Sequence, residues 1–234
     1  MRQRLTNLLL FLFTFGATIL TSCGKDKEVC VDEYSKFTGY IAFYYHTSEK
    51  LSASCYSVDN MNGIHVSLDL ASRLPKEEEN ALAVSINDTL TYWYMFYKYD
   101  TRVVVDRAVD FDVTANKAFD SEHPAGSSLK SFFSVAVDDH FAYVTNGYKV
   151  PDRPYYTGND LNTTKSPYYE RATYNAPMDR TDWHDFVLLP YSFLLDLTTP
   201  PDSTGEYTFT VTFEMENGIK GSAQTAAIWI KGRE

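Results

Sequence analysis

The sequence predicts an all-β fold with one or two short helices. Apolar and polar residues alternate with period two in many short segments, and aromatic residues make up 15% of the chain, with 18 Tyr and 15 Phe. Such alternation is typical of half-buried strands, and aromatic side chains pack well on a pleated surface. Because about ten short strands are separated by turn signals, we expect an immunoglobulin-like β-sandwich.

The first 22 residues have the pattern of a secretory signal. Arg2 and Arg4 supply the positive charge, and the uncharged stretch from Leu8 to Leu20 follows them. That stretch of about 13 residues fits the apolar core of a signal peptide, and it is shorter than the roughly 20 residues that span a membrane. We therefore expect residues 1–22 to be removed.

The residues that follow this stretch resemble a bacterial lipobox. They read Leu20-Thr21-Ser22-Cys23-Gly24, and in a lipobox the cysteine is acylated and becomes the first residue after cleavage. The resemblance implies that Cys23 carries three fatty chains. Since each buried methylene contributes about 0.8 kcal/mol, several chains hold a protein stably on a membrane.

A polar tether separates Cys23 from the folded part of the chain. Lys25, Asp26, Lys27 and Glu28 resemble the charged export tag of lipoproteins from Bacteroides-like bacteria, or they form a plain solvated spacer. We expect a lipid anchor in the bacterial outer membrane, with the protein facing the periplasm or the cell surface. Residues 23–36 would be the tether and residues 37–234 the β-sandwich domain.

The composition argues against one class of partner. The chain carries 21 Lys and Arg and 31 Asp and Glu, for a formal net charge of −10. Binding to a phosphate backbone needs cationic side chains that displace counterions, so we do not expect nucleic acid as a partner.

Two cysteines remain once Cys23 is assigned to lipid. Cys30 and Cys55 form an even pair in an exported protein, where disulfides persist. Neither lies in a metal-binding spacing such as C-x-x-C. The sequence leaves open a Cys30–Cys55 disulfide and two separate thiols.

Alternating and apolar segments locate the expected strands. The clearest strands are 64–70, 108–113 and 207–213, where every second residue is apolar. A hairpin is expected at Asn217-Gly218, because this dipeptide tolerates the positive φ angles of a tight turn, with a returning run that ends at 227–230. The other predicted strands are 40–46, 52–58, 82–86, 90–98, 103–106, 135–137, 141–145 and 186–189.

Helix signals are few. Ser127 or Ser128 could cap a short helix that continues to Phe133, after a turn at Pro124-Ala125-Gly126. Residues 72–80 offer a second short helical turn, with Pro75 near its start and three glutamates after it.

The segment 146–182 is the candidate binding region. It is rich in Tyr, Pro, Asn, Asp and Thr and poor in aliphatic residues, and long loops of this kind are often functional. Flat aromatic rings stack on sugar rings or protein surfaces while polar groups bind hydroxyls, although tyrosines in such a loop can also simply pack over a core. The candidate binding residues are Tyr155, Tyr156, Tyr168, Tyr169, Trp183, Arg153, Asp160 and Asn162.

No motif indicates metal binding or catalysis. The five histidines lack the i, i+4 spacing of a metal-binding helix, and Asn159-Asp160-Leu161-Asn162 lacks the glycine and distal glutamate of an EF-hand. The chain also has no G-x-S-x-G elbow. The prediction is a protein without a metal, a cofactor or enzymatic activity.

Several segments resemble small lipoproteins of unknown function from Bacteroides-like gut bacteria. They are residues 109–114, 123–129 with Phe132-Phe133, and 205–212 with the hairpin after it. The resemblance implies a cell-envelope address and a β-rich fold, and it carries no catalytic residue. In that group Asp-Ser/Thr motifs resemble O-glycosylation acceptors, which makes Ser203 and Thr89 candidates.

Together these features predict a cell-envelope lipoprotein that acts as a binding or assembly component. The partner would be a glycan or another envelope protein, bound through the Tyr-rich segment. The alternatives are a structural accessory subunit of an outer-membrane complex and a polysaccharide hydrolase.

Overall fold

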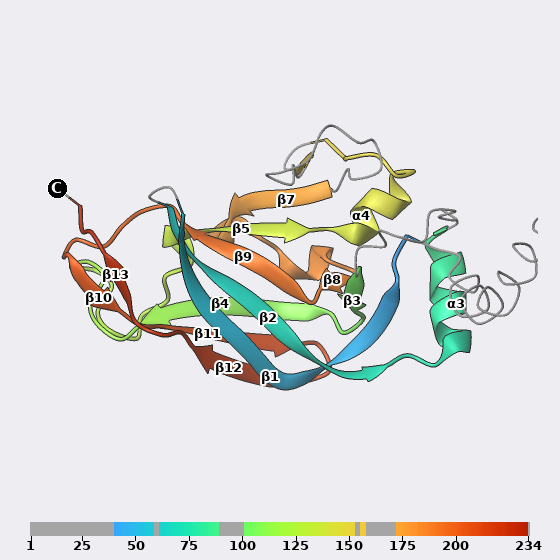
Figure 1. Ribbon diagram of the computed structural model, residues 1–234, viewed down its shortest axis with the longest axis horizontal. Coiled ribbons are helices and arrows are strands. Elements are labelled where there is room, and N and C mark those ends of the chain that lie inside the picture. Colours follow the sequence, from blue (N-terminus) through green and yellow to red (C-terminus); the bar gives the residue numbers. More distant parts are fainter. Residues whose placement is uncertain (1–39, 59–60, 89–100, 153–154, 158–171, 234) are drawn as a thin grey trace, which may run out of the picture.

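The computed structural model describes residues 40–58, 61–88, 101–152, 155–157 and 172–233. These residues form mostly β-sheet, together with two short α-helices and three 3-10 turns (Figure 1). In this part of the chain no helix is long and apolar enough to cross a membrane. The prediction of a β-rich fold with short helices is confirmed.

The largest sheet has eight strands and is mainly antiparallel. The long β1–β2 hairpin lies near its middle, and β1 also pairs in parallel with β3. In spatial order the strands are β6 (Tyr155–Thr157), β7 (Ala172–Pro177), β5 (Phe133–Asp138), β9 (Ser192–Leu197), β2 (Met61–Arg73), β1 (Phe43–Val58), β3 (Arg102–Val104) and β8 (Leu189–Pro190).

Two smaller sheets complete the fold. An antiparallel three-stranded sheet has the order β12 (Lys220–Gln224), β11 (Phe209–Met215) and β4 (Ala108–Ala115). A two-stranded ribbon of β10 (Gly205–Tyr207) and β13 (Ile228–Ile230) lies at one end of the long axis, and helix α3 (Lys76–Ser85) lies at the other (Figure 1).

One hydrophobic core joins the eight-stranded and three-stranded sheets. Alternate residues of β2, β5 and β9 on one side and of β4 and β11 on the other are buried in it. At its centre the Phe111 ring of β4 contacts Phe193 of β9, with ring centroids 5.0 Å apart. The residues that alternate with these buried ones on β4 and β11 face away from the core, which makes them available for a surface site.

A second, smaller core lies between α3 and α4 (His140–Thr145). Ile41, Tyr44, Ile86, Val103, Val144 and Leu188 are buried there. The buried carboxylate of Asp88 accepts hydrogen bonds from the backbone N–H groups of Tyr40 at 2.6 Å and Ile41 at 2.9 Å, and from the Tyr148 hydroxyl at 3.0 Å. Asp88 therefore fastens the start of the described chain to the segments after both helices.

Two segments predicted as strands are helical, so these predictions are wrong. Residues 82–86 belong to α3 and its C-terminal end, where Pro75 precedes the helix and three glutamates occupy the first turn. Residues 141–145 belong to α4, whose first turn is capped by Asp139 accepting the Ala142 N–H at 2.8 Å. The proline and the acidic residues favour helix starts, and this local signal outweighs the short apolar runs.

The other segment predictions have mixed outcomes. The predicted strand 52–58 lies within β1, and 135–137 lies within β5. The predicted strands 40–46 and 103–106 are confirmed only at residues 43–46 of β1 and 103–104 of β3. The expected helix after Ser127 or Ser128 is a single 3-10 turn, Lys130–Phe132, and 186–189 contributes only Leu189 to a strand. The segment 90–98 lies outside the described residues.

The predicted hairpin at Asn217-Gly218 is confirmed. β11 and β12 pair in register across it, and Gly218 has the positive φ of +84° that favours glycine. The returning strand ends earlier than expected, because β12 stops at Gln224 and residues 228–230 pair with β10 instead.

Candidate functional site

The outward face of the three-stranded sheet is a regular array of polar side chains. Each outward residue of β11 lies between one partner on β4 and one on β12, which gives three rows across the sheet. The rows are Asp110, Glu214 and Lys220; Asp112, Thr212 and Ser222; and Thr114, Thr210 and Gln224. Since the inward residues fill the core, the array is held on a rigid support.

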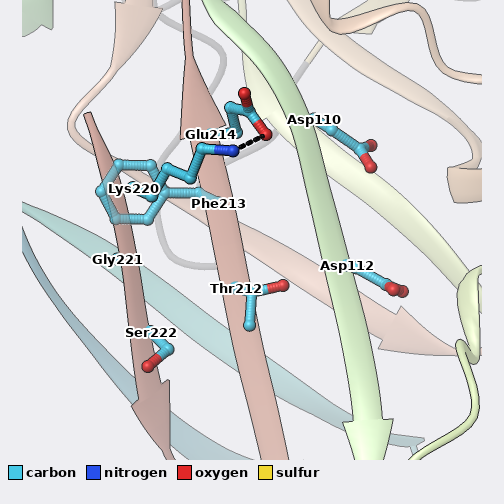
Figure 2. Close-up of a pocket in the computed structure, with 8 residues that line it drawn as sticks. All are labelled: Asp110, Asp112, Thr212, Phe213, Glu214, Lys220, Gly221 and Ser222. Carbon is cyan, nitrogen blue, oxygen red and sulfur yellow. Dashed lines mark ion pairs between the residues drawn. The ribbon is translucent and has the colours of Figure 1, made fainter. Parts of the chain in front are cut away.

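The first two rows form an open recess of about 530 Å³ (Figure 2). Its volume falls within the roughly 300–1,000 Å³ of small-molecule sites. The residues that line it are Asp110, Asp112, Thr212, Phe213, Glu214, Lys220, Gly221 and Ser222. Apart from Phe213 and Gly221, every one of them carries a hydroxyl, a carboxylate or an ammonium group.

Ion pairs and hydrogen bonds fix the polar groups around the recess. Lys220 Nζ lies 2.8 Å from Glu214 Oε2, as the dashed line in Figure 2 shows. Lys130 Nζ contacts both oxygens of Asp110 at 2.6 Å. The Ser128 hydroxyl donates to Asp112 Oδ1 at 2.6 Å. The recess thus presents oriented donors and acceptors, and its charges are largely balanced in pairs.

The floor of the recess depends on a glycine. A Cβ added at Gly221 would overlap the backbone carbonyl oxygen of Glu49 on β1 and would lie 2.5 Å from Cε1 of Phe213. Strand β1 therefore passes directly behind β12, and only glycine accommodates this approach. The β1 backbone and the Phe213 ring together support the recess from below.

Trp183 lies inside the protein, so its predicted role in binding is wrong. It is 2% exposed and belongs to the 3-10 turn Trp183–Asp185, which Asp182 caps by accepting the His184 N–H at 3.0 Å. Its ring packs on Phe111 with centroids 4.4 Å apart. The cap turns the indole into the core, where no ligand can reach it.

Other predicted binding residues are only partly placed. Tyr155 and Tyr156 belong to β6, where their backbone positions pair with Tyr174 and Thr173 of β7. The remaining predicted binding residues lie outside the described residues, namely Arg153, Asp160, Asn162, Tyr168 and Tyr169. The segment 146–182 is not one continuous loop, because it includes β6, β7 and the 3-10 turn Met178–Arg180.

The predicted modification sites lie at different places. Cys23, Cys30 and Thr89 fall outside the described residues. Cys55 is half-buried, its thiol lies 3.8 Å from the Ala226 carbonyl oxygen, and burial raises the pKa of this thiol. Ser203 is exposed in the turn before β10. The Cys30–Cys55 disulfide stays a prediction.

Several histidines lie beside carboxylates, and His184 lies near two of them, Asp182 and Glu216. In the described ranges no three His, Cys, Asp or Glu side chains are arranged to hold a metal ion. His123 Nδ1 lies 2.7 Å from Asp120 Oδ1, and this hydrogen bond is the main cause of a lowered pKa for the Asp120 carboxyl. The Asp182 carboxyl also has a lowered pKa, mainly because it accepts the backbone N–H of His184.

The sequence signal for the polar recess was present in the alternation of β4 and β11. Asp110, Asp112, Thr212 and Glu214 are the outward members of two strands that the sequence predicts correctly. Their convergence with Lys220 and Ser222 depends on strand order and register, which periodicity alone does not give. No family model matches the chain, and neither a curated protein nor a solved structure matches it.

Proposed function

We propose that this protein is a lipoprotein of the bacterial outer membrane, anchored through Cys23, and that it binds glycan at the polar recess on β4, β11 and β12. The observation that carries the binding proposal is the recess itself, which is open, of ligand size and lined by fixed hydroxyl, carboxylate and ammonium groups. The lipobox-like segment at Leu20–Gly24 supports the anchor.

The chemistry of the recess suits a polyhydroxylated ligand. Sugar hydroxyls both donate and accept hydrogen bonds, and carboxylates such as Asp112 accept while the Lys220 ammonium donates. Hydroxyl groups on Thr212 and Ser222 do both. Because the site is open to water, bridging water molecules can complete the hydrogen bonds that direct contacts do not make.

The Tyr-rich segment stays a second candidate for contacting a glycan or an envelope protein. Pairing of β6 with β7 brings the backbone of Tyr155 opposite Tyr174 at one edge of the eight-stranded sheet. This arrangement gathers tyrosines on neighbouring strands. Three other predictions stay open. They are a role as a structural accessory subunit, a hydrolase activity, and an immunoglobulin-like arrangement of the eight-stranded and three-stranded sheets.

The glycan proposal predicts that an Asp112→Asn substitution weakens binding by about tenfold. The amide keeps an oxygen for Ser128 but loses the charge that strengthens hydrogen bonds from sugar hydroxyls. Affinity electrophoresis of the full-length protein in detergent, in gels containing dextran, mannan, laminarin or hydroxyethyl cellulose, measures the effect. The matched control is Asp179→Asn, at an exposed position outside the recess. Equal retardation of both variants and the wild type would contradict the assignment of the recess.

The anchor predicts that Cys23→Ser abolishes lipid attachment. Growing cells would be labelled with radioactive palmitate, and the wild-type protein should be labelled and should lack residues 1–22. The serine variant should be unlabelled, because a hydroxyl does not replace the thiol that receives the lipid. A wild-type protein that remains unlabelled and retains Met1 would refute the anchor and the proposed location.

A further inference from the structure

The polar face of the three-stranded sheet continues beyond the recess. From Gly205 to Met215 every odd-numbered residue is buried and every even-numbered one is at least partly exposed, with no break at Thr208 between β10 and β11. The outward residues are Glu206, Thr208, Thr210, Thr212 and Glu214. At about 3.4 Å per residue this outward row extends up to about 27 Å, which is much longer than one sugar ring.

A tryptophan stands at the far end of the outward row. Trp229 of β13 is directly opposite Glu206 of β10, and 66% of its surface is exposed. Val84, Leu194 and Trp229 are the large apolar residues exposed in the described part of the chain, and Trp229 alone among them is aromatic. An exposed indole offers a flat apolar face, with a polar N–H at its edge, on which a ligand can stack.

The ribbon fixes the backbone at Trp229 and keeps its side chain on the outer face. Ile230 is buried and Ile228 is half-buried against the main core, so the strand cannot rotate to bury the indole. The chain after it is also fastened: Gly232 N–H donates to Thr204 Oγ1 at 2.8 Å, and the Arg233 guanidinium lies 2.5 Å from Asp202. Because tryptophan has only two χ angles, its side chain on this fixed backbone loses little conformational entropy when a ligand stacks on it.

The surroundings of Trp229 match a sugar better than an apolar partner. Glu206 is the residue directly opposite Trp229, and the Cβ atoms of directly opposed residues lie about 4.5–5.5 Å apart. Two residues before Trp229, just ahead of β13, stands Ala227, which is exposed and too small to cover the indole. A pyranose ring can place its C–H face on the indole and its hydroxyls against the carboxylate and Thr208.

We infer that the ligand is a linear polysaccharide segment that lies along the outward row, with one ring stacked on Trp229 and other rings contacting the recess. This inference rests on the proposed glycan binding and adds the class of ligand and a second contact point. The two ends of the outward row offer complementary contacts. The recess supplies polar groups but no exposed aromatic side chain, and Trp229 supplies the stacking surface.

The position of Trp229 in the molecule fits a tethered binding protein. The ribbon of β10 and β13 lies at the opposite end of the long axis from α3, and the start of the described chain packs against α3 (Figure 1). A chain held through the residues before Tyr40 would present the ribbon away from its attachment. An extended polymer can reach that end without crossing the tether.

The test compares Trp229→Ala, Trp229→Phe and a control, Val84→Ala, which removes an exposed apolar side chain at the other end of the molecule. Full-length protein in detergent is run in gels containing dextran, mannan, laminarin or hydroxyethyl cellulose. Oligosaccharides of two to eight units, made from the polysaccharide that retards the wild type, are then titrated. Trp229→Ala should weaken binding of the polysaccharide and the longest oligosaccharides about tenfold, and Trp229→Phe should weaken it less.

Each outcome separates this inference from the proposed function. The inference is supported if affinity rises with chain length in the wild type and this rise disappears in Trp229→Ala but not in Val84→Ala. It is overturned, with the recess proposal intact, if Asp112→Asn weakens binding and Trp229→Ala does not. If the wild type binds none of the four polysaccharides, both the glycan proposal and this inference are overturned. A protein that only docks another protein through Trp229 would give this result.

Discussion

Replacing Phe111 by alanine should lower the free energy of unfolding by about 3–5 kcal/mol, the usual cost of removing a fully buried phenylalanine side chain. Phe111 has no exposed surface and lies where three parts of the fold meet. Its ring centroid is 4.4 Å from that of Trp183, 5.0 Å from that of Phe193 and 5.9 Å from that of Phe213. No neighbouring side chain can fill the cavity without giving up its own contacts.

Urea denaturation followed by tyrosine and tryptophan fluorescence measures this loss. Thr114→Ala is the matched control, since Thr114 lies on the same strand but faces outward, and it should change the free energy by about 0.5 kcal/mol or less. If Phe111→Ala cost no more than Thr114→Ala, the eight-stranded and three-stranded sheets would not share the larger core described above. The slope of the denaturation curve checks that both variants unfold in one transition.

Phe111→Ala should also disturb the proposed binding recess, although Phe111 does not line it. Asp110 and Asp112 flank Phe111 on β4, and their side chains point outward because the Phe111 side chain points inward. Loosening the core at Phe111 allows β4 to shift relative to β11. The register that places Asp112 beside Thr212 depends on the packing beneath it.

Periodicity predicted the strands that are half-buried and long. β11 alternates throughout, β2 alternates over residues 64–69 and β4 over residues 110–115, since one face of each meets the core and the other meets water. The hairpin at Asn217-Gly218 was equally predictable, because its backbone geometry is a local property of the dipeptide. These elements carry most of the recess.

Short apolar runs were the main source of error. Residues 141–145 are apolar and β-prone in composition, yet the Asp139 side chain caps a helical turn there. A run of five residues fits one face of a helix as well as a strand, so the capping residue decides the outcome. Asp139 was visible in the sequence and was the signal to use.

Trp183 and Trp229 show why surface sites are hard to find from sequence. Trp183 stands among polar residues and is buried, whereas Trp229 stands between two isoleucines and is exposed. The burial of Trp183 depends in part on Phe111, which is distant in the sequence. Trp229 is exposed on β13, which pairs with β10. The sequence-based prediction had assigned residues 227–230 to the strand that returns from the β11 hairpin.

Replacing Asp88 by alanine should lower the free energy of unfolding by about 3–5 kcal/mol, because buried donors that lose a charged acceptor keep the full cost of their desolvation. The backbone N–H of Ile41 is buried, and that of Tyr40 is partly buried, and both would lose the carboxylate acceptor. The Tyr148 hydroxyl would lose its 3.0 Å hydrogen bond to Asp88 and keep the longer one to the Asn87 carbonyl oxygen. The loss should be concentrated at the start of the described chain.

Hydrogen exchange distinguishes this local effect from general destabilisation. In Asp88→Ala the amides of Tyr40, Ile41 and Ala42 should exchange far faster than in the wild type, while those of β11 should change only as much as the overall stability does. Asp88→Asn keeps one acceptor oxygen, so its exchange rates at these amides should lie between those of the wild type and of Asp88→Ala. Asp179→Ala, at an exposed position, is the control. Since the residues before Tyr40 lead to Cys23, the hydrogen bonds of Asp88 would be the first in the described fold to carry a force from the proposed lipid anchor. Unchanged exchange at Tyr40 and Ile41 would show that Asp88 does not hold the start of the chain.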